Sequence, residues 1–169
     1  KKKKNAYRVT LELYRGDQQV EEHPVLDLLY NPNPVQGQVE FFQSLYSYLL
    51  ISGNSYILES GAENTPPIEL YTLRPDRIRI KGSSRAIPDA YNYMVGGQIV
   101  ESYEVDQATG KSKIKHIKLF NPMDDYYGLS PIVAGAYNID QHNLAGLHNV
   151  GLLKNGCTPS AMLNFFFFF

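Results

Sequence analysis

Alternating apolar and polar residues predict strands along much of the chain. Residues 7–14 alternate in this way, and a period of two is typical of a half-buried strand. Similar alternation or strand-rich composition predicts further strands over residues 55–59, 68–73, 77–80, 91–95, 98–105 and 113–119. Gly96-Gly97 joins two of these stretches, and glycines supply the positive φ angles that a tight hairpin turn requires. Residues 91–119 are therefore predicted to form a small antiparallel meander.

Apolar residues that recur every three or four positions predict helices. The clearest helix starts at Gln38 and ends at Gly53-Asn54. Its apolar stripe comprises Val39, Phe42, Leu45, Tyr46, Leu49 and Leu50. A shorter helix is predicted over residues 23–29, because Pro24 suits a first helical position and the prolines that follow at residues 31–34 stop the helix.

A long helix is predicted near the end of the chain. Ser130 can cap its free N–H groups, and Pro131 stands where no hydrogen-bond donor is missed. The helix runs to about Lys154, and Asn155-Gly156 ends it, since glycine readily adopts the left-handed conformation of a helix C-cap. The order of elements predicts an α+β fold, in which an antiparallel strand meander with packed helices is followed by this long helix.

The charge balance argues against a general nucleic-acid binder. The 169 residues include 16 Lys and Arg against 17 Asp and Glu, so the formal net charge of -1 gives no basic field over the whole chain. Residues 1–4 are all Lys and residues 165–169 are all Phe, and neither run is typical of native sequence. We expect both tails to be artefacts and exclude them from the fold. The single cysteine, Cys157, rules out an intramolecular disulfide framework, and no signal peptide or membrane helix is predicted.

No catalytic constellation stands out. The glycine pair of the predicted hairpin is not followed by the Lys and Ser or Thr of a P-loop, and no Gly-x-Ser-x-Gly nucleophile elbow is present. His142 and His148 lie about 240° apart around a helix, which disfavours a shared metal ion. Asp124-Asp125 could hold a cation or support the start of the long helix. We predict no cofactor, no metal site and no enzymatic activity.

Basic residues alternate with apolar residues in two of the predicted strands. The positions are Arg74, Arg77, Arg79, Lys111, Lys113, Lys115 and Lys118. This pattern predicts one solvated, charged sheet face, and contact with phosphate is the alternative.

Several short strings follow one another in an order that is typical of one family. They are His23-Pro24-Val25-Leu26-Asp27-Leu28-Leu29 with Asn31-Pro32-Asn33-Pro34, residues 48–56 (YLLISGNSY), residues 70–78 (LYTLRPDRI), His116-Ile117, Tyr127-Gly128-Leu129-Ser130-Pro131, and Lys154-Asn155-Gly156 with Pro159. Over roughly residues 23–163 the chain resembles the portal proteins of tailed double-stranded DNA bacteriophages, in the branch also found in prophages and gene transfer agents. The motif positions with an expected structural role are Gly53, Asn54, Arg74, Pro75, Asp76, Gly128, Ser130, Pro131, Asn155 and Gly156.

The resemblance implies a structural protein of the virion. Family members form a ring, typically of twelve subunits, at one capsid vertex, and the ring is assembled in the bacterial host cytoplasm. The terminase large subunit pumps double-stranded DNA through the channel without sequence specificity, and the DNA later leaves by the same route. Capsid and head-tail connector proteins are the other implied partners, with no membrane and no cofactor.

The resemblance also divides the chain. Residues 5–122 would form a wing-like α+β domain, residues 123–157 a stem-like helix that lines the channel, and residues 158–164 the start of the clip. Small residues would let stem helices of adjacent subunits approach closely, and the expected positions are Gly135, Gly146 and Gly151. Lys154 would make at most a weak phosphate contact. The family continues through a return stem helix and a crown, so we expect a fragment or the ordered part of a longer chain.

Two other functions stay open on the sequence. A nuclease could use Asp124 and Asp125 with a divalent metal ion, since two-metal phosphodiester cleavage needs clustered carboxylates. A virion adaptor that forms no ring could use a tyrosine-rich sheet, given the 13 Tyr of the chain, to bind another structural protein.

Overall fold

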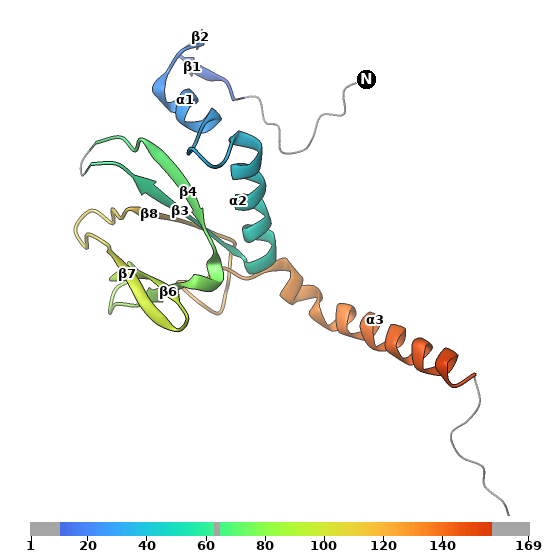
Figure 1. Cartoon of the computed structure of the whole chain (residues 1–169). Coiled ribbons are helices and arrows are strands. Elements are labelled where there is room, and N and C mark those ends of the chain that lie inside the picture. Colours follow the sequence, from blue (N-terminus) through green and yellow to red (C-terminus); the bar gives the residue numbers. More distant parts are fainter. Residues whose placement is uncertain (1–10, 63–64, 157–169) are drawn as a thin grey trace, which may run out of the picture. The chain divides into compact units, whose positions relative to one another are not determined.

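The structure is a computed structural model that describes residues 11–62 and 65–156, and their helices and antiparallel sheets confirm the predicted α+β class (Figure 1). The strands are β1 (Leu13–Arg15), β2 (Gln18–Val20), β3 (Asn54–Ser60), β4 (Glu69–Leu73), β5 (Ile78–Lys81), β6 (Ala90–Val95), β7 (Gln98–Glu104) and β8 (Ile114–Lys118). The helices are α1 (Pro24–Tyr30), α2 (Gln38–Ser52) and α3 (Pro131–Lys154), with a 3-10 turn over Pro75–Arg77.

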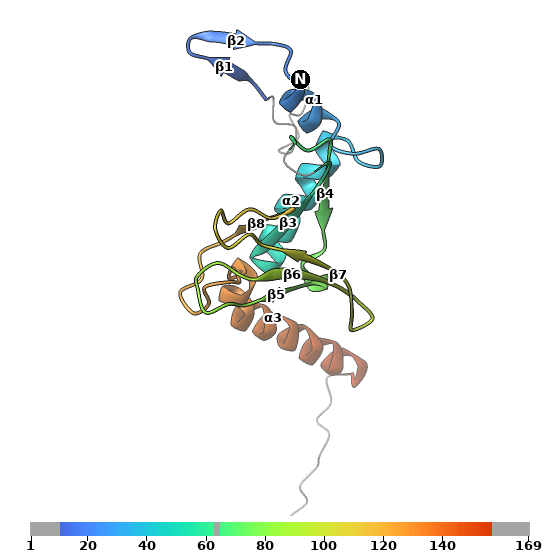
Figure 2. The same cartoon turned by 90° about the vertical axis from the view of Figure 1, so that its left-hand side faces the viewer.

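Two three-stranded sheets and a helix form three layers. One sheet has the strand order β4-β3-β8 and the other β5-β6-β7, with all neighbours antiparallel. The main core lies between the two sheets and comprises Tyr56, Ile78, Tyr91, Val105 and Ile114. A second core lies between α2 and the first sheet and comprises Phe41, Leu45 and Leu70. The sheet β4-β3-β8 is therefore covered on both faces, by α2 on one and by the other sheet on the other (Figures 1 and 2).

The prediction that β8 continues the meander was wrong. The meander comprises β5, β6 and β7 only, whereas β8 crosses to the other sheet and pairs with β3, with Tyr56 opposite His116 and Leu58 opposite Ile114. Ile114 is buried in the core between the sheets through this pairing. Alternation identifies residues 113–119 as a strand, but it carries no information on the strand partner, which depends on packing with distant segments.

The ends of the first two helices follow the predicted signals. His23 is the N-cap of α1, where its Nδ1 accepts a hydrogen bond from the Val25 N–H at 3.2 Å, and Pro24 occupies the first turn. Helix α2 ends at Gly53, which has a φ of 76° and donates its N–H to the Leu49 carbonyl. The left-handed glycine lets the chain leave the helix and enter β3 in one residue.

Two tight hairpins turn at glycines. Gly96 and Gly97 both have positive φ, 61° and 84°, and connect β6 to β7 as predicted. The hairpin β1–β2 turns at Gly16, and only its first strand was predicted, over residues 7–14. The described part of that prediction starts at residue 11, and the strand begins at Leu13.

The contacts within the chain divide it into two compact units. The first unit ends at Ile132 and the second begins at Val133. Helix α3 starts after Ser130 and continues to Lys154, as predicted, and Gly156 then takes a φ of 59°. Within the described residues, no helix combines the length and apolar character needed to cross a membrane.

Candidate functional site: the junction before α3

The motif glycines Gly53 and Gly128 pack backbone against backbone. A Cβ atom added to Gly128 would lie 2.1 Å from the Gly53 carbonyl oxygen and 2.8 Å from the Leu119 nitrogen. A Cβ added to Gly53 would lie 2.5 Å from the Leu129 carbonyl carbon. The Leu119 N–H donates to the Gly53 carbonyl at 2.9 Å. We call this meeting of residues 50–54, 116–123 and 127–132 the junction, and it joins the end of α2 and the end of β8 to the start of α3.

Asn54 fixes the junction with its side-chain amide. Its Oδ1 accepts the Gly128 N–H at 2.7 Å, and its Nδ2 donates to the carbonyls of Gly128, at 3.2 Å, and Ser52, at 2.9 Å. Both backbone groups of Gly128 are thus satisfied by one buried side chain. The sequence resemblance marked Asn54 and Gly128, 74 residues apart, and the structure brings them together.

Ser130 connects the two helices that meet at the junction. Its hydroxyl donates to the Leu50 carbonyl near the end of α2 and accepts the Ile132 N–H in the first turn of α3, both at 3.1 Å. The predicted cap is present, with Pro131 as the first helical residue. Ser130 therefore satisfies an orphan group of each helix, a carbonyl of one and an N–H of the other.

His116 completes the hydrogen bonds of Asn54. Its Nε2 lies 3.0 Å from Asn54 Oδ1, and because that oxygen is an acceptor, Nε2 carries the proton. The ring stacks on Tyr56 with centroids 4.4 Å apart and meets Tyr91 edge-on at 5.9 Å. Burial, with a smaller contribution from the charge of Lys118, lowers the pKa of His116 to about 4. The half-buried imidazole is neutral at pH 7 and serves as a hydrogen-bond donor to Asn54.

The lowered pKa of His116 predicts acid sensitivity. The unfolded chain binds a proton near pH 6.5 and the folded chain only near pH 4, so stability is complete above about pH 6.5 and falls as the pH drops toward 4. For a partly exposed group the loss reaches about 2–3 kcal/mol. Urea unfolding between pH 8 and 4.5 measures it. The variant His116→Gln keeps a donor for Asn54, and its unfolding free energy is expected to fall less over this interval. Equal slopes for both proteins would contradict the assignment.

Two tyrosines before α3 bind β5 and the loop that follows it. The Tyr127 hydroxyl accepts the Ile80 N–H of β5 at 2.8 Å, and the Tyr126 hydroxyl donates to the Arg85 carbonyl at 2.8 Å. These contacts were not predicted, since nothing in the local sequence identifies partners more than 40 residues away. The contact of Tyr127 with Ile80 connects the loop before α3 to the sheet β5-β6-β7.

Asp124 has a structural role in this loop. Its Oδ1 accepts the N–H groups of Tyr126 and Tyr127, at 2.7 and 2.9 Å, which is the geometry of an Asx turn. These hydrogen bonds lower the pKa of Asp124 below its usual value. Asp125 accepts a hydrogen bond from Lys118 through its backbone carbonyl. Among the described residues, no three His, Cys, Asp or Glu side chains gather as metal ligands.

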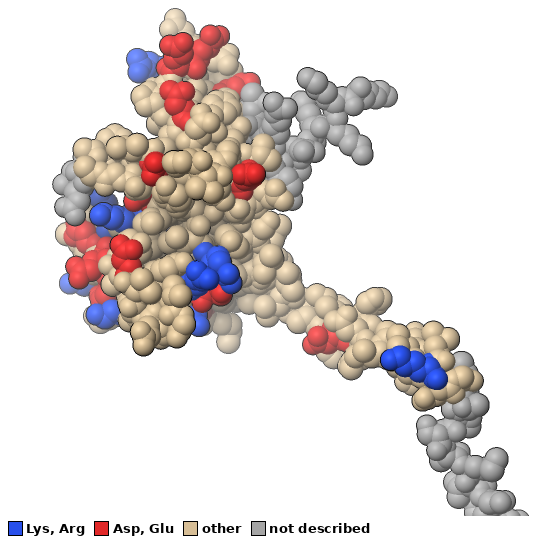
Figure 3. Space-filling view, viewed as in Figure 1, with Lys and Arg blue, Asp and Glu red and all other residues tan. Residues whose placement is uncertain are grey.

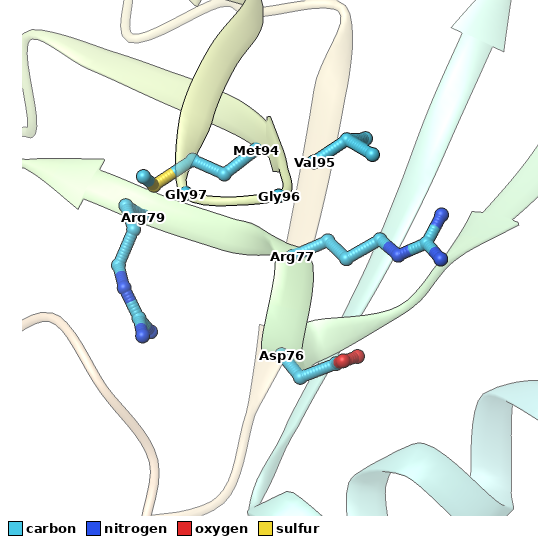
Figure 4. A pocket seen from close by; sticks show the side chains of 7 residues that line it. All are labelled: Asp76, Arg77, Arg79, Met94, Val95, Gly96 and Gly97. Atoms are coloured by element: carbon cyan, nitrogen blue, oxygen red, sulfur yellow. The ribbon is translucent and has the colours of Figure 1, made fainter.

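The motif Arg74-Pro75-Asp76 forms the turn between β4 and β5. Arg74 binds the Asp76 carboxylate with two hydrogen bonds, from Nε at 3.0 Å and Nη2 at 2.8 Å, around the 3-10 turn that Pro75 starts. The guanidinium lowers the pKa of the exposed Asp76 carboxyl. The turn redirects the chain from β4 into β5 of the other sheet. Next to it, a shallow hollow of 270 Å³ is lined by Arg77, Arg79 and the β6–β7 turn (Figure 4).

The remaining predicted positions lie on α3 or just after it. Added Cβ atoms at Gly135, Gly146 and Gly151 would meet nothing within 4 Å, so these glycines are not required by packing within the described chain. Lys154 is in the exposed last turn, and the Asn155 N–H donates to the Gly151 carbonyl as the helix ends. The structure thus groups Gly53, Asn54, Gly128, Ser130 and Pro131 at one place.

Comparisons with known proteins agree with the resemblance. The family model for phage portal proteins matches residues 3–165. Two relatives, from Rickettsia bellii (strain RML369-C) and Rickettsia felis (strain ATCC VR-1525 / URRWXCal2), carry the name "Uncharacterized protein" and are each 33% identical to the chain. The alignments cover 85% and 88% of this chain but only 36% and 38% of the relatives.

Solved structures extend the comparison to assembled particles. The neck of an empty gene transfer agent (GTA) particle, computed with C6 symmetry, contains a chain that is 41% identical, with a TM-score of 0.73 over 83% of this chain and 37% of that one. The neck of the native GTA particle, computed with C12 symmetry, gives 40% identity and a TM-score of 0.71, over 80% of this chain and 37% of that one. The chain spans a little over a third of the length of these relatives, and the family match over nearly all of its residues shows that it belongs to the phage portal protein family.

Proposed function

We propose that this chain is part of a portal subunit that forms a ring around a DNA channel at one vertex of a virion or virion-like particle. Family membership makes it a structural protein rather than an enzyme. The observation that supports the ring is the similarity, at about 40% identity, to chains in GTA necks computed with C12 and C6 symmetry. Both symmetries are compatible with twelve copies around one axis.

The proposed role determines the partners. The ring passes double-stranded DNA without sequence specificity while the terminase large subunit packages it, and releases it at ejection. Capsid proteins surround the ring, head-tail connector proteins continue it, and assembly takes place in the bacterial host cytoplasm. The net charge of -1 supports passage without retention, because a strongly basic chain would bind phosphate throughout.

We assign the domains of this role along the chain. Residues 5–122 form the wing-like part, and residues 123–157 contain the stem-like helix, of which α3 is the described portion. The proposed start of the clip, residues 158–164, lies outside the described residues. Lys154, in the last turn of α3, is the position that we propose for a weak contact with DNA phosphate.

The three glycines of α3 suit contacts with two neighbours. At about 100° per residue, Gly135 and Gly146 lie within about 20° of each other around the helix, whereas Gly151 lies about 140° from Gly146. One neighbouring helix cannot contact all three. In a ring, each subunit contacts one neighbour on either side, and two nearly opposite glycine faces match this arrangement.

Enlarging Gly146 is expected to impair the ring and leave the subunit folded. In Gly146→Leu the new side chain meets open space within the chain, and helix propensity improves by about 1 kcal/mol. We expect ring yield of the full-length protein, measured by negative-stain microscopy, to fall at least tenfold while the melting temperature of the monomer does not decrease. Ala145→Leu, one residue and about 100° away, is the matched control. Normal rings from Gly146→Leu would remove Gly146 from the interface.

A further inference from the structure

The junction leaves apolar side chains in water on all three of its segments. Phe120 is 86% exposed and Met123 is 90% exposed, in the loop between β8 and α3. Leu50 and Ile51 are exposed at the end of α2, and Leu129 and Ile132 at the start of α3. We call these six residues the junction surface. Hydrogen bonds from Leu119 to Gly53 and from Ser130 to Leu50 hold the three segments together, so these side chains belong to one fixed region.

Two of the three segments of the junction surface lie in uncharged stretches of the chain. Residues 41–58 and 126–139 contain no Asp, Glu, Lys or Arg, although 20% of all residues in the chain are charged, and the charges near the third segment are Lys118, Asp124 and Asp125. In Figure 3 neither blue nor red covers the C-terminal half of α2 on the face shown. Exposed apolar side chains grouped on a rigid backbone are typical of a surface that another protein covers. A partner that covers these six side chains must supply apolar side chains of its own.

A second copy of the chain offers such side chains on α3. Val133, Tyr137, Leu144 and Leu147 are all exposed, and their spacing places them within about 80° of one another around the helix. Asp140 lies within this stripe, and Gly151 extends it by one turn. The stripe differs from the junction surface, as a ring requires, because head-to-tail contacts join two different surfaces of the same chain.

We propose that the junction surface of one subunit packs against the α3 stripe of the next subunit. The inference rests on the proposed ring, and it adds the two surfaces that meet. Closing the ring therefore buries apolar side chains of both surfaces, and exposed Phe120 and Met123 act in assembly rather than in folding.

Photocrosslinking in the full-length protein identifies what covers the junction surface. We would replace Phe120 by p-benzoylphenylalanine, irradiate purified rings and map the product by mass spectrometry. The expected product has the mass of two chains and joins position 120 to a peptide from residues 131–154. Ile68, which is 73% exposed and lies between β3 and β4, is the control position and should give no product with that peptide. A crosslink within one chain, or to any other peptide, would overturn the proposal.

Charge substitutions test the same contact by its effect on assembly. Phe120→Asp with Met123→Asp is expected to reduce ring yield at least tenfold with an unchanged melting temperature of the monomer, because both side chains are exposed. Ile68→Asp should form rings like the wild type. If the wild type forms rings and the double variant forms them equally well, the surface is wrong and the ring is right. If the wild type forms no ring, both this inference and the proposed function fail.

Discussion

Replacing Gly128 by alanine is expected to destabilise the first compact unit by about 4 kcal/mol or more. The added Cβ would lie 2.1 Å from the Gly53 carbonyl oxygen and 2.8 Å from two backbone atoms of Leu119. All three obstacles are backbone atoms, so no side chain can rotate to make room. The end of α2 and the start of α3 would have to separate, and the hydrogen bonds of Asn54 and Leu119 would be lost with them.

Thermal and urea unfolding followed by circular dichroism measure this effect. The matched control is Gly146→Ala, the same chemical change at a glycine with open space around it, and it should stabilise α3 by up to about 1 kcal/mol. If Gly128→Ala unfolds within 1 kcal/mol of the wild type, the two backbones do not pack as closely as described.

The variant Asn54→Ala is expected to destabilise the chain by about 3 kcal/mol. The change leaves the N–H and carbonyl of Gly128 without their partner and removes the acceptor of the His116 ring. Each buried polar group that loses its partner costs about 1–3 kcal/mol, and water entering the space left by the amide recovers part of the loss.

Asn92→Ala provides the comparison for that measurement. The Asn92 side chain also forms a hydrogen bond, because it accepts the Ser102 hydroxyl at 2.7 Å, but this hydrogen bond is exposed on the sheet β5-β6-β7. Its loss should change the unfolding free energy by less than about 1 kcal/mol. Similar effects of the two variants would mean that Asn54 does not organise the junction.

Local signals were sufficient to predict most elements of the fold. The spacing of apolar residues in α2, the glycine that ends it, and the Ser-Pro start of α3 each act through neighbours within about four residues, which a single sequence displays. The Gly96-Gly97 hairpin is of the same kind, since the turn itself requires those residues. Strand β8 was placed wrongly because strand partnership depends on burial between distant segments.

The junction shows what local patterns omit. Gly128 looks like a residue that opens a helix, and only the structure reveals that it is a glycine because Gly53 lies against it. The tyrosines at 126 and 127 likewise bond to β5 and to the loop after it. Family resemblance marked Gly53, Asn54, Gly128 and Ser130 as positions of interest. Only the structure shows that these residues meet and together join the end of α2 to the start of α3. The glycines of α3 remain predictions, since their proposed partners are other subunits.

Electron microscopy of the purified full-length protein that carries this sequence tests the central claim most directly. Two-dimensional class averages should show rings with a central hole and rotational symmetry, twelvefold on the present account. A strict monomer at micromolar concentration, with or without the other head proteins, would contradict the portal ring and favour an adaptor that binds a different virion protein.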